Sequence, residues 1–479
     1  MRKTFSLAAP LVALVALAAL ASCTHDAVRP PEIPTSQQYT PTPVAEERLA
    51  PGKDIPAQWW TLFRSPALDG LVRQALEASP TLARAGAKLR QAQEDLGART
   101  GGTRFPKVDA KLSANRVDVN PQSLGVQALP VQTPFNLYLA SVGVSYTLDL
   151  FGANRRELEA LQAGVDYQRY ELDASRLMLA GNVVTAAIRE ASLREQIAAT
   201  EELVVLQERQ LAITERLVNL GTAAQADAVA QRLDLAQIRA VLPDLQRQLE
   251  QVRHRLAVYV GQPPGAARLP EFRLAELQLP PELPLSLPSE LARQRPDIRA
   301  AEALLYQAGA RVGVASANLY PQITLSANVG SLASNAGDLF SSGSGFYVLG
   351  ASLTQPLFHG DELQSKRRSA IAAYEQAGAA YQEVVLQSFQ NVADVLRALE
   401  ADAKKVKERT EAATQARTYH DITSARFKAG GVSYFFLLDA QRKLHGALID
   451  RTQALADRYA DSAALFQALG GGWWQGPDR

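Results

Sequence analysis

The sequence contains one pattern twice, at a spacing of roughly 210 residues, and this internal repeat constrains the fold more than any other feature. Phe105-Pro106-Lys107-Val108 in the first half matches Tyr320-Pro321-Gln322-Ile323 in the second. Other matched pairs keep the same order along both halves: Pro80 with Pro296, Leu150-Phe151 with Leu357-Phe358, Arg216 with Arg426, and Gly221 with Gly431. We therefore expect two copies of one unit, each running helix, strand, loop, strand and long helical tract.

Four short segments alternate between apolar and polar residues, which predicts strands at about 107–117, 137–150, 322–333 and 345–357. The polar face of these strands carries Lys107, Asp109, Lys111, Ser113, Asn115, Ser141, Ser145, Thr324, Ser326 and Asn328. A transmembrane barrel strand shows this period, with apolar residues toward lipid and polar residues toward the lumen. A soluble sheet with one face on a core shows it too, so the alternation alone leaves both alternatives open.

Two stretches without charge favour the membrane alternative. Residues 119–148 and 312–337 contain no charged side chain, although 21% of the whole chain is charged. Prolines in the first stretch exclude a spanning helix there. Tyr138, Tyr146 and Tyr347 stand at strand ends, where the aromatic girdles of membrane barrels lie.

Four strands cannot close a barrel, and open edges are not viable in lipid. Two copies would supply eight strands and almost no lumen, whereas three copies would supply twelve strands and a pore. The membrane alternative therefore predicts a homotrimer.

Two long tracts without proline, 155–242 and 361 to about 469, predict helical hairpins at about 155–258 and 361–469. They are rich in Ala, Leu, Gln, Glu and Arg, which favour helices. A helix of roughly 60 residues would be about 90 Å long, too long for the core of a globular domain. Matching the two repeats places the hairpin turns at Leu193-Arg194 and Ala403-Lys404. A simple coiled coil or a cytoplasmic helical rod is the alternative, and an export signal at the N-terminus, described next, argues against it.

The N-terminus predicts that signal. Arg2 and Lys3 precede an apolar stretch over 5–20, which is short for a membrane span. Leu20-Ala21-Ser22-Cys23 resembles the bacterial lipobox, and Cys23 is the only cysteine. We expect residues 1–22 to be a lipoprotein signal peptide and Cys23 to carry N-palmitoyl and S-diacylglycerol groups. Residues 23–57 would then be a lipidated, proline-rich tether.

Composition excludes several other functions. Lys and Arg total 50 and Asp and Glu total 49, so no net field attracts nucleic acid. One cysteine and five scattered histidines predict no disulfide, no metal site and no cofactor besides the lipid. No nucleophile elbow, phosphate loop or dinucleotide fingerprint is present, so we expect no enzyme. A structural tether between membranes stays as an alternative, but a tether needs no barrel strands.

Specific motifs carry a family resemblance. They are Trp59-Trp60-Thr61-Leu62-Phe63, Arg295-Pro296-Asp297-Ile298, Gln355-Pro356-Leu357-Phe358, Leu438-Asp439-Ala440-Gln441-Arg442 and Ala468-Leu469-Gly470-Gly471-Gly472-Trp473. With them the chain resembles the TolC-like outer membrane factors, in particular the lipoprotein branch called the NodT family. The resemblance runs from about Trp59 to Trp474.

The resemblance implies a mixed α/β membrane protein. A trimeric twelve-stranded outer-membrane β-barrel, with four strands per chain, would continue into a long periplasmic α-helical barrel with an equatorial domain. Residues 58–265 and 289–474 would be the two repeats, 266–288 an equatorial linker, and 475–479 a tail.

The implied function is a passive exit duct for drugs or other small molecules. The duct would dock with a periplasmic adaptor and an inner-membrane pump, commonly a resistance-nodulation-division transporter. A type I secretion duct or another export duct is the alternative.

The resemblance also implies site residues. Val406 would form a hydrophobic constriction and Glu411 an acidic one at the periplasmic aperture, with Glu408 as a substitute one turn away. The usual acid is Asp, so Glu411 departs from the family pattern, and a solvated helix surface is the alternative. Adaptor contacts are expected at the turns, on Leu193, Arg194, Ala403 and Lys404.

Overall fold

The computed structural model describes residues 38–44, 49–53, 55–118, 134–280, 282–286 and 288–473. The predicted signal peptide, the lipid site Cys23, most of the tether and the predicted tail lie outside the described residues. The chain divides into two compact units, each built from both repeats. Unit 1 includes residues 89–168 and 301–381, and unit 2 includes 33–88, 169–300 and 382–479.

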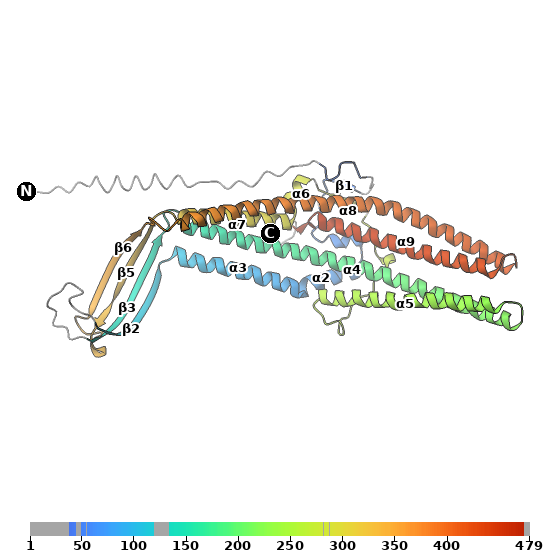
Figure 1. Cartoon of the computed structure of the whole chain (residues 1–479), viewed down its shortest axis with the longest axis horizontal. Coiled ribbons are helices and arrows are strands. Elements are labelled where there is room, and N and C mark those ends of the chain that lie inside the picture. The colour runs from blue at the N-terminus through green and yellow to red at the C-terminus, as the bar shows by residue number, and fades with distance from the viewer. Residues whose placement is uncertain are drawn as a thin grey trace, which may run out of the picture. The chain divides into compact units, whose positions relative to one another are not determined.

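Unit 1 contains one antiparallel sheet of four strands (Figure 1). These are β2 (Lys107–Val117), β3 (Phe135–Leu148), β5 (Gln322–Ala333) and β6 (Gly345–Thr354), in the order β2-β3-β5-β6. β2 and β5 have the predicted bounds, whereas β3 begins and ends two residues early and β6 ends three residues early. Each repeat thus supplies one pair of antiparallel strands. The two pairs are connected by hydrogen bonds between β3 of the first repeat and β5 of the second.

Each strand pair continues into helices. α3 (Pro80–Arg104) enters β2, and α4 (Ala153–Asn219) follows β3; α7 (Pro296–Ala317) and α8 (Glu362–Lys428) take the same places in the second repeat. None of the described helices is long and apolar enough to cross a membrane.

The core of unit 2 is built around aromatic side chains of the family motifs. Trp59, in a short 3-10 helix (Trp59–Phe63), stacks on Phe466 with ring centroids 5.3 Å apart. The Tyr459 hydroxyl donates to the Leu277 carbonyl at 2.7 Å. Residues of the predicted linker therefore belong to this core, beside α2 (Pro66–Ala78) and α6 (Pro288–Gln294). A two-stranded parallel sheet of β1 (Leu49–Pro51) and β4 (Leu283–Leu285) lies in the same unit.

The C-terminal glycine motif closes onto this core. Arg295 is buried, and its Nη1 donates to the Ala468 carbonyl at 2.7 Å. The Trp473 indole donates to the Gln294 carbonyl at 2.6 Å, so this tryptophan has a packing role. These contacts of the motif residues stabilise the core of unit 2.

Both hairpin turns were predicted in the wrong place. α4 and α8 each run 67 residues without a break, and α5 (Gln225–Tyr259) and α9 (Tyr434–Ala468) each have 35. Each pair lies antiparallel (Figure 1). The chain turns at residues 220–224 and 429–433, so the prediction placed each turn about seven helical turns too early. Leu193 is fully buried against Ile197 and Leu245, which is why the helix continues there.

Candidate functional site

The polar face of the sheet is continuous across all four strands. Lys107 lies opposite Ser145, which lies opposite Ser326, which lies opposite Gly350. The other predicted polar residues share this face through the same register: Asp109, Lys111, Ser113, Asn115, Ser141, Thr324 and Asn328. The Thr147 and Thr324 hydroxyls lie 3.3 Å apart across β3 and β5. These side chains therefore lie on one face of the sheet, as their alternation predicts, and that this face lines a lumen stays a prediction.

The opposite face is apolar and exposed. Val108, Val144, Ala327 and Leu349 form one row across the sheet. Leu112 is 78% exposed and Tyr347 is 77% exposed. In water such a contiguous apolar face would be unfavourable, so it marks a surface that another phase or partner covers.

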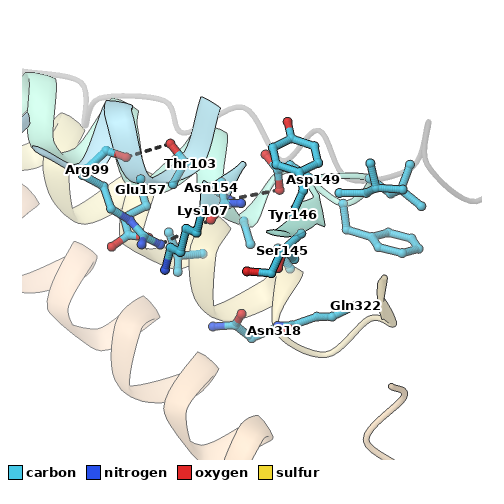
Figure 2. Close-up of a pocket in the computed structure, with 18 of the residues that line it drawn as sticks. Arg99, Thr103, Lys107, Ser145, Tyr146, Asp149, Asn154, Glu157, Asn318 and Gln322 are labelled. Carbon is cyan, nitrogen blue, oxygen red and sulfur yellow. Dashed lines mark hydrogen bonds and ion pairs between the residues drawn. The ribbon is translucent and has the colours of Figure 1, made fainter. Parts of the chain in front are cut away.

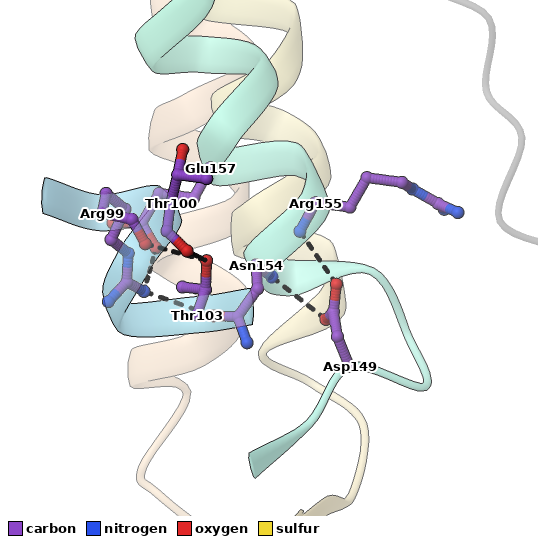
Figure 3. Close-up of polar contacts among 7 residues, drawn as sticks. All are labelled: Arg99, Thr100, Thr103, Asp149, Asn154, Arg155 and Glu157. Atoms are coloured by element: carbon purple, nitrogen blue, oxygen red, sulfur yellow. Dashed lines mark hydrogen bonds and ion pairs between the residues drawn. The ribbon is translucent and has the colours of Figure 1, made fainter. Parts of the chain in front are cut away.

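The strand-to-helix junction is fixed by polar contacts (Figure 3). The Asp149 carboxylate accepts from the backbone amides of Asn154 at 3.0 Å and Arg155 at 2.8 Å, at the start of α4. An acidic group satisfies the free amides of a helix N-terminus and interacts favourably with its dipole. Arg99 of α3 pairs with Glu157 of α4 and reaches the Asn154 side chain at 3.3 Å. These contacts set the direction in which α4 leaves the sheet.

A polar cavity of about 400 Å³ lies at this junction (Figure 2). Its walls come from the ends of α3, β2 and β3 and from the strand–helix turns of both repeats, including Lys107, Ser145, Asn318 and Gln322. Arg99, Lys107 and Glu157 lie close together on one side of it (Figure 2). The polar face of the sheet therefore leads directly into this cavity.

The hairpin ends lie at two glycine turns. Gly221 and Gly430 have φ of 73° and 72°, the left-handed conformation that favours glycine at a helix C-terminus. The Thr222 amide bonds the Leu217 carbonyl at 2.9 Å, and the Gly431 amide bonds the Arg426 carbonyl at 2.8 Å. The matched pair of Gly221 and Gly431 in the sequence repeat was the signal that could have placed both turns.

The residues predicted at the turns have other roles. Arg194 bonds Glu190 of its own helix at 3.0 Å and Glu271 of the linker at 3.2 Å. Lys404 pairs with Glu400 at 2.9 Å within α8, beside Ala403. Leu193, Arg194, Ala403 and Lys404 all lie inside long helices, so the prediction that they form hairpin ends is wrong.

The predicted aperture residues Val406, Glu408 and Glu411 also lie inside α8. At 1.5 Å per residue they stand about 25 to 35 Å before the end of that helix. Val406 is half-buried, and Glu408 and Glu411 are exposed. The Glu411 carboxylate accepts from Gln415 at 2.7 Å.

No metal centre is formed by the part of the chain that the structure describes: no three His, Cys, Asp or Glu side chains gather in a way that could hold a metal. His420 lies 3.0 Å from the neighbouring Asp421 carboxylate as an adjacent pair on α8. Burial lowers the pKa of His445 on α9. None of these groups is set against a nucleophile or a second base.

The sequence model of the outer membrane efflux protein family matches residues 71–262 and 287–471. The match covers more than half of the chain and includes both repeats. The chain belongs to the outer membrane efflux protein family. The proteins that it resembles are outer membrane channels of efflux systems, and this chain is one of that kind.

Two relatives illustrate the range of the family. The pyoverdine export outer membrane protein OpmQ of Pseudomonas aeruginosa is 32% identical over 422 residues, 87% of each chain. The probable efflux pump outer membrane protein TtgC of Pseudomonas putida is 29% identical over 458 residues, 93% of this chain and 91% of TtgC.

Solved structures show the TolC-like fold. The outer-membrane channel OprN has a TM-score of 0.84 and 27% identity, covering 94% of this chain and 100% of that one. VceC of Vibrio cholerae has a TM-score of 0.78 and 26% identity, covering 88% and 100%. The fold predicted from the sequence, a four-stranded contribution to a TolC-like channel, is confirmed.

Proposed function

We propose that three copies of this chain form an outer-membrane exit duct in a tripartite efflux system. The observation that carries this proposal is the sheet of unit 1. Among the described residues its outer strands β2 and β6 each pair on one side only, and its apolar face is exposed. Unpaired strand edges are unfavourable in lipid, so pairing β2 of one copy with β6 of the next removes them. Three copies then supply twelve strands and a polar-lined pore.

Exposed apolar side chains at the end of β6 support a membrane boundary at the junction. Leu357 is 92% exposed and Phe358 is 87% exposed. Aromatic residues favour the interface between hydrocarbon and water. With the apolar sheet face in lipid, the helices α3, α4, α7 and α8 begin or end at this boundary and continue into the periplasm.

The hairpin ends are the proposed docking surface for a periplasmic adaptor. Leu220, Phe435 and Phe436 are exposed large apolar side chains at or beside the two turns. Such residues at an otherwise polar helix end favour contact with a partner protein. An inner-membrane pump, of the resistance-nodulation-division type, would supply the energy for a passive duct.

Cargo and anchoring complete the proposal. Relatives are named for export of pyoverdine, toluene and antibiotics, so the proposed cargo is small organic compounds. Cys23, which lies outside the described residues, is the proposed site of N-palmitoyl and S-diacylglycerol groups that hold the protein in the outer membrane. Val406, Glu408 and Glu411 are proposed to narrow the helical tunnel where three copies of α8 approach.

The experiment that tests the duct is conductance of the purified protein in a planar lipid bilayer. We expect discrete channels and a trimer that dissociates on heating in detergent. A monomer that does not change on heating and forms no conducting channel would refute the proposal. Metabolic palmitate labelling of wild type and Cys23→Ala tests the anchor separately, with label expected only in the wild type.

A further inference from the structure

Charged side chains on the polar face of the sheet come from a single strand. Within the four strands, β3, β5 and β6 contain no charged residue, while β2 contains Lys107, Asp109, Lys111 and Arg116. The register places the first three on the polar face and Arg116 on the apolar face. The polar face therefore carries two cations and one anion per chain.

Small residues stand beside these charges and leave them uncovered. On β3, the direct neighbours of Lys107, Asp109 and Lys111 are Ser145, Gly143 and Ser141. The next strand continues the pattern with Ser326, Asn328 and Gly330. A Cβ on Gly330 would lie 2.3 Å from the Ala140 carbonyl oxygen, so no larger residue fits at this position unless the backbone moves. Lys107 and Lys111 are consequently long charged side chains whose neighbours on β3 and β5 are short.

The cavity at the junction does not neutralise this positive charge. The Glu157 carboxylate is paired with Arg99, and both Asp149 oxygens accept backbone amides of α4. Lys107, at the edge of the same cavity, has no ion-pair partner in the described ranges of the chain, and neither does Lys111. The acids near the cavity are thus engaged, and the lysines of β2 are available to a passing solute.

We propose that Lys107 and Lys111 make the sheet segment of the duct selective for anions, so that it favours solutes bearing carboxylate or similar acidic groups. This inference rests on the proposed function, which turns the polar face toward the lumen. Three copies would place six lysines against three Asp109 carboxylates around one passage. Rings of charged side chains set ion preference in pores by attracting the opposite charge.

Bilayer recordings under a salt gradient test the inference, with the anion-to-cation permeability ratio as the readout. We expect Lys107→Gln with Lys111→Gln to lower the ratio about twofold, and Asp109→Asn to raise it. Screening makes the change depend on ionic strength, because the Debye length grows from about 10 Å at 0.1 M salt to about 30 Å at 0.01 M. The change should therefore be larger in dilute salt.

Arg116→Gln is the matched control, because it removes one positive charge from the same strand but on the opposite face. It should leave the permeability ratio unchanged. Conducting channels whose ratio is the same in wild type and in all polar-face variants would overturn this inference and leave the duct intact. An equal change in Arg116→Gln would also overturn it, since the face would then be irrelevant. A wild type without conductance would refute the duct itself.

Discussion

Asp402 of α8 and Asp461 of α9 share a hydrogen bond between their side chains inside unit 2. Asp402 is buried, and its Oδ2 has no hydrogen-bond partner in the described structure. Burial raises the pKa of Asp402 to about 7, and Asp461 and Asp457 add to the shift while Lys405 opposes it. Burial likewise raises the pKa of Asp461. Two neighbouring carboxyl groups of α8 and α9 thus hold their protons more tightly than exposed carboxyls do.

This pair predicts a stability that falls as the pH rises. A carboxyl whose folded-state pKa is above its unfolded value binds its proton more tightly when folded, so ionisation opposes folding. The penalty should begin above about pH 4 and be complete above about pH 7. We expect Asp402→Asn to raise the thermal midpoint by a few degrees at pH 8 and by clearly less at pH 5, where only part of the penalty is present. Calorimetry of the purified protein at both pH values measures this.

Asp394→Asn is the control for that prediction. Asp394 is an exposed carboxyl on the same helix, with Gln390 as its partner at 3.3 Å. It should change the thermal midpoint equally at both pH values. If Asp402→Asn behaves in the same way, the raised pKa of Asp402 has no role in stability.

Glu190 predicts a second stability effect, in the first hairpin. Its side chain is fully buried and accepts from Arg194 at 3.0 Å and Arg253 at 2.6 Å, so it joins α4 to α5. Glu190→Gln keeps the shape but removes the carboxylate that pairs with Arg253, and it leaves Arg194 with Glu271 alone. We expect a loss on the order of 2 kcal/mol in unfolding free energy, because the arginines are only partly exposed. The exposed Glu250→Gln on α5 should cost far less in the same denaturation experiment.

The strands could be predicted closely because their signal is local. Alternation of period 2 in 107–117 and 322–333 fixes both the extent and the face of each strand, and the register brings the predicted polar residues together. The hairpin turns do not lie at the middle of the helical tracts, because a helix of 67 residues pairs with one of 35. Contacts such as Asp402 with Asp461 depend on how α8 and α9 pack, and no local pattern in the sequence shows that.

Gly472 predicts a severe effect in the C-terminal motif. Its φ is +68°, and an added Cβ would lie 2.2 Å from the Ile55 carbonyl oxygen, which is backbone and cannot rotate away. Gly472→Ala should therefore lower the free energy of unfolding by about 2 kcal/mol or more, through both strain and overlap, and lower the thermal midpoint with it. Gly265→Ala has open space around its Cβ and serves as the control. Equal midpoints for the two variants would show that the motif is not closed onto Ile55.

The exposed apolar residues at the hairpin ends predict a loss of efflux without a loss of the channel. Leu220 and Phe436 lie beside the two turns and are 75% and 50% exposed, so polar replacements should not disturb the core. We expect Leu220→Ser with Phe436→Ser to lower efflux several-fold in cells, because adaptor contact loses apolar area, while bilayer conductance stays the same. Val241→Ser, exposed in the middle of α5, is the control and should keep both activities. Unchanged efflux in the double variant would place the adaptor elsewhere on the helices.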